Sequence, residues 1–124
     1  MASNVVTADE RKALSVLAFL LFRMGQGERA ARIYEAIAEL SDPESSDWRF
    51  AQEGIAAARI ELGDGEAALA AVKAAMKGRS LSTKEAALHL MKAQALWLMG
   101  RKDEAQASRD TYIALTGRTT KEEE

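Results

Sequence analysis

The sequence predicts an all-α protein built from three antiparallel helix pairs, six helices in total. Three observations lead to this fold class. Gly25, Gly63 and Gly100 lie 38 and 37 residues apart (63 − 25 and 100 − 63), and an alanine follows each of them five residues later. Apolar residues recur three and four apart on both sides of each glycine. The 124 residues include one proline and no segment that alternates like a strand. Such a repeat is typical of stacked helical hairpins.

The first pair is expected over residues 8–43. Thr7 or Asp9 can cap a first helix that runs to about Met24, and a second helix covers about 28–40. Apolar side chains occur nearly all round the first helix, which indicates that it is covered on more than one side. The only proline follows the second helix and cannot continue it.

The second pair is expected over residues 45–78. Ser45, Ser46 or Asp47 can cap its first helix, because a side-chain oxygen there can accept from a free backbone N–H. Gly78 is expected to end its second helix.

The third pair is expected over residues 82–116. Its first helix should open with a capping box at 82–85, a serine followed three residues later by a glutamate. Gly117 is expected to cap the last helix. We expect residues 1–7 to form a flexible tail and residues 117–124 a charged, disordered one, because neither has an apolar face to bury.

Small residues flank each turn at matching positions. Each turn glycine is preceded seven residues earlier and followed five residues later by an alanine, which would let the two helix axes approach closely. We expect these alanines and the turn glycines to set the repeat: Ala18, Gly25, Ala30, Ala56, Gly63, Ala68, Ala93, Gly100 and Ala105.

The composition argues against several kinds of function. The formal net charge is −2 with mixed signs, so there is no basic stripe for nucleic acid. There is no cysteine, and His89 is the only histidine, so we expect no metal, no cofactor and no catalytic triad. Neither a secretory signal nor a long apolar span is present, so we expect a cytoplasmic protein without membrane insertion.

The turns and small residues resemble the tetratricopeptide repeat, a family of paired helices about 34 residues long. The resemblance covers about residues 8–116 and depends most on Leu17, Ala18, Gly25, Ala30, Tyr34 and Pro43, with Ile55, Ala56, Gly63, Asp64, Ala68 and Ala75 in the second repeat and Ala93, Gly100 and Ala105 in the third. Lys92 and Arg109 depart from the family pattern, as expected where a terminal repeat faces water. The resemblance implies a short right-handed superhelix.

In this family the first helices of the pairs line a concave groove that binds other proteins. The resemblance places seven residues of this chain there: Phe19, Phe22, Phe50, Ala57, Ile60, Leu90 and Trp97. They would form a partner-binding surface for an apolar helix or segment. The alternative is that they are ordinary core residues.

Small three-repeat proteins of this kind are similar to the chaperones of bacterial type III secretion. That resemblance implies a non-enzymatic cytoplasmic chaperone that binds an apolar segment of a secretion component. The alternative is a homodimerising scaffold or adaptor of another bacterial assembly, which would cover the same surface with a second copy.

Overall fold

The computed structural model describes the backbone of residues 6–79 and 85–123, and the side chains of these residues as far as 117. Within these ranges the chain forms six helices. They are α1 (Ala8–Arg23), α2 (Gly27–Leu40), α3 (Ser46–Glu61), α4 (Gly65–Met76), α5 (Ala87–Leu98) and α6 (Lys102–Glu123).

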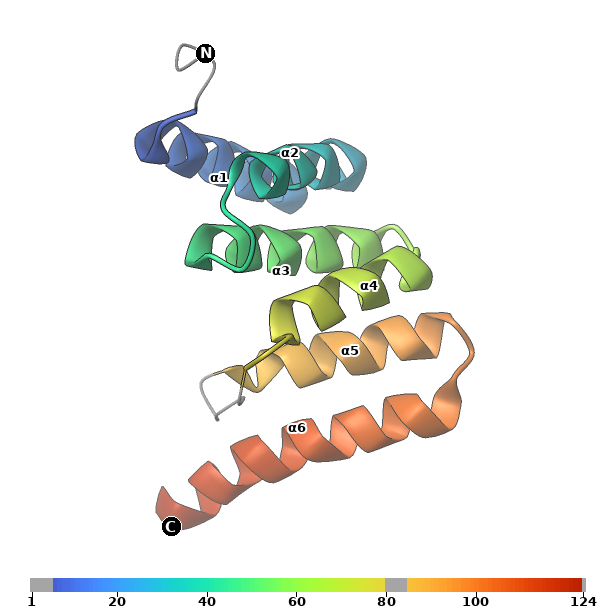
Figure 1. Cartoon of the computed structure of the whole chain (residues 1–124). Helices are drawn as coiled ribbons and strands as arrows, with labels where there is room; N and C mark the ends of the chain where they lie inside the picture. The colour runs from blue at the N-terminus through green and yellow to red at the C-terminus, as the bar shows by residue number, and fades with distance from the viewer. Residues whose placement is uncertain (1–5, 80–84, 124) are drawn as a thin grey trace.

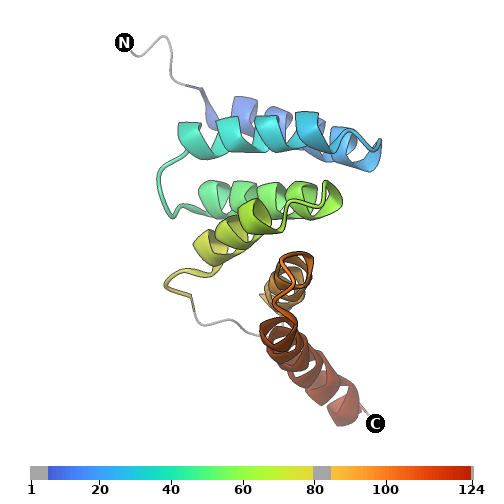
Figure 2. The same cartoon turned by 90° about the vertical axis from the view of Figure 1, so that its right-hand side faces the viewer.

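The helices pack in consecutive pairs, and the pairs follow one another along a stack (Figures 1 and 2). Each helix packs against the next in the chain, and the first helix of each pair also contacts the first helix of the neighbouring pair. Helices α1 and α6 lie at opposite ends of the stack (Figure 1). The described residues contain no strand. The all-α, six-helix prediction is therefore confirmed as a stack of helical hairpins.

Short polar side chains start three of the helices. The Thr7 hydroxyl accepts from the Glu10 N–H at 3.1 Å, and the Glu10 carboxylate accepts from the Thr7 N–H at 2.9 Å, which is a complete capping box. Ser45 accepts from the Trp48 N–H at 3.2 Å at the start of α3, and Asp64 accepts from a backbone N–H at the start of α4. The predicted caps at Thr7 and Ser45 are confirmed.

The three turn glycines adopt the left-handed backbone conformation that favours glycine. Gly25, Gly63 and Gly100 have φ angles of 81°, 78° and 76°, a region where a side chain would be strained. Each ends one helix and lets the next fold back within a few residues, so these turns need glycine for its backbone.

The six repeat alanines are all buried. Their relative exposure lies between 0% and 7%, and they pack where two helices come together. Ala18, Ala30 and Ala56 belong to a core cluster with Tyr34 and Ile37, whereas Ala68 and Ala105 belong to a second cluster around Leu96. A side chain with more atoms at these positions would push the helices apart.

Two further close approaches are not evident from the repeat. A Cβ atom on Gly54, in the middle of α3, would lie 2.5 Å from the ring of Tyr34 on α2. A Cβ atom on Gly65, at the start of α4, would lie 2.7 Å from the carbonyl oxygen of Ala95 on α5. Glycine is needed here because there is no room for a side chain, and the φ angle is not the reason.

Two predicted helix boundaries in the third pair need correction. The last helix does not end near Thr116, because the backbone of α6 stays helical through Gly117 to Glu123. A single glycine costs a helix only about 1 kcal/mol, and the glutamates and lysine that follow favour helix. The segment expected to be a disordered tail therefore has helical backbone as far as Glu123.

The start of α5 also differs. The helix begins at Ala87, with Ala86 at the N-cap and no side-chain cap. Ser82 of the predicted capping box lies outside the described residues, as do residues 1–5 of the predicted N-terminal tail. The Glu85 carboxylate forms an ion pair with Arg79 at 2.7 Å.

Candidate binding clefts on the first helices

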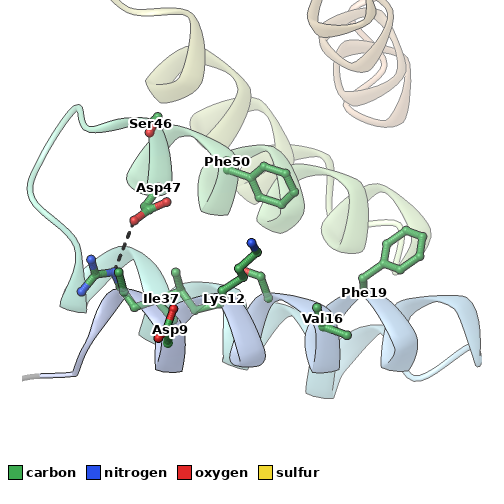
Figure 3. Close-up of a pocket in the computed structure, with 11 residues that line it drawn as sticks. Asp9, Lys12, Val16, Phe19, Ile37, Ser46, Asp47 and Phe50 are labelled. Carbon is green, nitrogen blue, oxygen red and sulfur yellow. Dashed lines mark hydrogen bonds and ion pairs between the residues drawn. The ribbon is translucent and has the colours of Figure 1, made fainter.

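A hollow of the described surface lies between α1 and α3 (Figure 3). This α1–α3 cleft has a volume of about 810 Å³, and most of its lining is apolar. Phe19 from α1 and Phe50 from α3 are 53% and 57% exposed in it. The lining residues are Ala8, Asp9, Arg11, Lys12, Ser15, Val16, Phe19, Ile37, Ser46, Asp47 and Phe50.

Charged groups lie at the end of the α1–α3 cleft where both helices begin. The guanidinium of Arg11 pairs with the carboxylate of Asp47 at 3.4 Å (Figure 3). It also donates to the carbonyl oxygen of Val6 at 2.8 Å. Lys12 extends from α1 towards α3 in the same region (Figure 3). Phe19 lies at the opposite end of the cleft from Asp47, with Phe50 and Lys12 between them (Figure 3).

A second hollow, the α5–α6 cleft, lies in the last pair. Its volume is about 530 Å³, and Ile60 of α3 also borders it. Trp97 is 61% exposed here, and the ammonium group of Lys102 lies 5.5 Å from the centre of its ring. The lining residues are Ile60, Leu90, Ala93, Gln94, Trp97, Leu98, Ala105, Gln106 and Arg109.

The structure divides the predicted groove residues between these two clefts. Phe19 and Phe50 line the first, and Ile60, Leu90 and Trp97 line the second. The remaining two line neither cleft. Phe22 packs against the core cluster, and Ala57 is half-buried on α3. For Phe22 the structure agrees with the alternative interpretation, an ordinary core side chain.

An ion cluster joins α3, α4 and α5 through Arg79. Its guanidinium lies 3.8 Å from the carboxylate of Glu53 on α3 and 2.7 Å from that of Glu85 just before α5. Burial raises the pKa of Glu53 above its usual value; Arg79 opposes this shift, and the negative charge of Glu85 adds to it. The cluster links the second and third pairs.

The single histidine lies on α5 and is half-buried. Burial, with a smaller contribution from the positive charge of Lys92, lowers the pKa of His89. Neither cleft includes His89 in its lining.

Among the described residues, no group of three or more histidine, cysteine, aspartate or glutamate side chains is placed to hold a metal ion. None of the helices found in the same ranges has the length and apolar character needed to cross a membrane. No protein-family profile matches the chain, and no curated protein matches it significantly.

Sequence reasoning missed part of the cleft lining because it depends on helix ends. Arg11 and Asp47 meet only because the N-termini of α1 and α3 are adjacent. The periodic apolar pattern cannot reveal such a pair. Gln106 and Arg109 of α6 line the second cleft, and within the described ranges α6 packs chiefly against α5.

Proposed function

We propose that this chain is a non-enzymatic binding module that holds an apolar helix of another protein against its first helices. One observation supports the proposal above the others: three large aromatic side chains, Phe19, Phe50 and Trp97, are more than half exposed within apolar clefts. Exposed apolar patches rimmed by polar residues are typical of protein-binding surfaces.

Burial of the three exposed aromatic side chains would contribute a free energy comparable to the lower estimates of the cost of association. An aromatic side chain buries about 150–250 Å², so covering its exposed half contributes roughly 2 kcal/mol at about 25 cal/mol per Å². Association costs about 4–15 kcal/mol in lost translational and rotational freedom. Burial of all three aromatic side chains would offset only the lower part of that range. A tight complex would therefore use both clefts together with contacts between them.

An amphipathic helix is the partner segment that fits best. Helices lie in apolar grooves by presenting side chains three, four and seven residues apart, and here the two clefts are separate hollows along the stack. The charged groups of the α1–α3 cleft, Lys12 and the Arg11–Asp47 pair, would fix the direction in which the partner helix lies.

The resemblance to tetratricopeptide proteins supports a more specific form of the proposal. In that form the protein is a cytoplasmic chaperone of the type III secretion kind, and the bound segment belongs to a secreted or needle-forming subunit that would otherwise aggregate. The alternative function is a homodimerising scaffold, in which a second copy covers the clefts.

The proposal is tested by comparing proteins captured by the wild-type chain and by variants. Phe50→Glu and Trp97→Glu each place a charge in one cleft, and we expect each to lose at least about tenfold in affinity for the captured protein. The captured protein is identified by mass spectrometry, purified, and titrated against each variant. Ile113→Glu is the matched control, because Ile113 is exposed on α6 and lines neither cleft.

Binding that survives both cleft substitutions would contradict the proposal. The helix content from circular dichroism should be the same for the wild type and all three variants, because the altered side chains are exposed. If the only protein captured at both clefts is the chain itself, the homodimerising alternative replaces the chaperone.

A further inference from the structure

The outer face of α1, which begins at the rim of the α1–α3 cleft, is apolar and uncovered in the described part of the chain. Leu20 and Met24 are 51% and 67% exposed, and Val16 and Leu17 beside them are also exposed. Arg29 and Arg32 of α2 border a hollow of about 490 Å³ on the same side, together with Leu17 and two other apolar residues. A terminal face in contact with water is normally polar.

The repeat shows that this face of α1 corresponds to faces of α3 and α5 on which a preceding helix pair packs. Shifted by 38 and then 37 residues, each position on α1 has a counterpart on α3 and on α5. On those helices the counterparts are mostly buried, because the preceding pair packs on them. The matching positions are Ala13, Leu17 and Leu20 on α1, Ala51, Ile55 and Ala58 on α3, and Leu88, Lys92 and Ala95 on α5. In the described part of the chain no helix pair packs on this face of α1, so the face is open.

A regular stripe runs along this open face. Its residues recur at intervals of four, three, four and three, the spacing that forms the seam between two packed helices. All five are exposed: Asp9, Ala13, Val16, Leu20 and Arg23. The stripe is apolar in its middle and has opposite charges at its two ends. No ion pair within the described ranges includes Asp9 or Arg23.

We propose that the outer face of α1 binds the same face of a second copy of this chain, with the two α1 helices antiparallel. Asp9 and Arg23 each lie seven residues from Val16, or about 10 Å along the helix. A twofold axis near Val16 therefore places Asp9 opposite the partner's Arg23, twice per dimer. Ala13 comes opposite the partner's Leu20, small against large.

A head-to-tail continuation of the stack does not fit this face. It would place α6 of another copy over α1, as α2 packs on α3. The α6 positions that would make that contact are Gln106 and Arg109, which are exposed and polar. Their counterparts, Ala31 and Tyr34 on α2 and Leu69 and Val72 on α4, are buried. The two ends of the stack are therefore not complementary, whereas the α1 stripe is complementary to itself.

The dimer does not depend on the proposed binding function. Leu20 lies outside both clefts, and Phe50 lies outside the stripe. Asp9 and Val16 belong to the stripe and also border the α1–α3 cleft. The dimer thus covers one rim of this cleft, and a client would enter from the α3 side. A Leu20 variant therefore tests the dimer and a Phe50 variant tests partner binding, so either proposal can fail while the other holds.

The test is sedimentation equilibrium of the purified full chain over a series of concentrations. We expect the mass to rise from that of the 13.5 kDa chain to twice that value. Leu20→Glu should abolish the dimer, because it would bury a charge in the seam. Asp9→Lys and Arg23→Glu should each weaken dimerisation by about tenfold, since each sets like charges opposite one another twice. The double variant Asp9→Lys/Arg23→Glu should recover the wild-type dissociation constant to within about threefold.

The double variant gives the most informative result. Each of its two changes opposes the α1 helix dipole, so damage to the helix itself would be larger in the double variant than in either single variant. Recovery of the dimer can therefore come only from the restored charge pairs. A wild-type chain that is monomeric at every concentration would overturn the proposal and leave this face to a different protein. A double variant that dimerises no better than the single variants would overturn the antiparallel arrangement. Phe50→Glu should leave the dimer intact, and a loss of dimer in that variant would place the interface in the cleft.

Discussion

Gly54 and Tyr34 determine how closely α2 and α3 approach each other. The ring of Tyr34 occupies the place where a Cβ atom of residue 54 would lie, 2.5 Å away. Tyr34 itself is buried in the larger core cluster and has little freedom to move. The contact therefore constrains both residues, although neither belongs to the turns.

Gly54→Ala should destabilise the fold. Alanine favours helix over glycine by about 1 kcal/mol, but the clash with the Tyr34 ring should cost about 1–3 kcal/mol beyond that gain. Unfolding in urea, followed by circular dichroism, measures the net change. Gly117→Ala is the control, because nothing lies within 4 Å of a Cβ atom at that helical position. We expect the control to be neutral or stabilising, and a Gly54→Ala variant that gains as much stability would contradict the close approach.

Sequence patterns predict different residues unequally well. Gly25, Gly63 and Gly100 could be placed because a turn between helices needs a positive φ, which is a property of a single residue. Gly54 could not, because its role depends on a side chain 20 residues away (54 − 34) on another helix. The predicted groove residue Phe22 is similar: its spacing fits the groove, but neighbouring side chains place it against the core.

At the scale of helices, the link between the second and third pairs is partly ionic. Arg79 follows α4 and lies between Glu53 on α3 and Glu85 before α5. Because burial raises the pKa of Glu53, the folded chain binds this proton more tightly than the unfolded chain does. The contribution of Glu53 to the free energy of unfolding therefore increases as the pH falls from neutral through the pKa of Glu53 in the folded chain. It levels off below the pKa that Glu53 has in the unfolded chain.

Glu53→Gln should remove this dependence on pH. The free energy of unfolding of the wild type, minus that of the variant, should increase as the pH falls from 7 to about 4. Urea unfolding at several pH values measures the difference. Glu61→Gln, at an exposed position near the end of the same helix, is the control. If the difference in free energy of unfolding between wild type and Glu53→Gln stays constant or shrinks as the pH falls, burial does not raise the pKa of Glu53 in the folded chain.

The helices also show what an apolar pattern can reveal. The all-round apolar character of α1 predicted a helix covered on more than one side, but in the described chain Phe19 is exposed in a cleft and Leu20 is exposed on the outer face. It could not distinguish the cleft from the open face, because that requires the position of α3. The end of α6 was missed because Gly117 matches a cap signal, although the residues after it favour helix.

For the whole molecule, the stack leaves different surfaces at its two ends. The N-terminal end carries the apolar outer face of α1, and the C-terminal end carries the polar side of α6 with Gln106 and Arg109. The α1–α3 cleft lies between two first helices, whereas the α5–α6 cleft lies in the last pair and includes Gln106 and Arg109 in its lining. Self-association would use the outer face of α1 and partner binding would use the clefts, and the two surfaces share only Asp9 and Val16 at the rim of the α1–α3 cleft.

The number of helices and their pairing could be predicted because the repeat occurs three times in 124 residues. The sequence predicted one concave groove, and it could not show that the groove residues divide between two clefts. That division depends on how Phe50, Ile60 and Leu90 are placed across three helices. The identity of a partner depends on a second sequence, so no pattern in this one determines it.

The most direct test of the binding proposal is photo-crosslinking in the cells that produce the protein. A photoreactive phenylalanine replaces Phe50 or Trp97 in the clefts, or Ile113 on α6 as the control. The account predicts that both cleft positions form a crosslink to the same protein, which the control position does not reach. Equal crosslinking from Ile113, or no crosslinked protein from either cleft, would contradict the proposal that these clefts hold a partner.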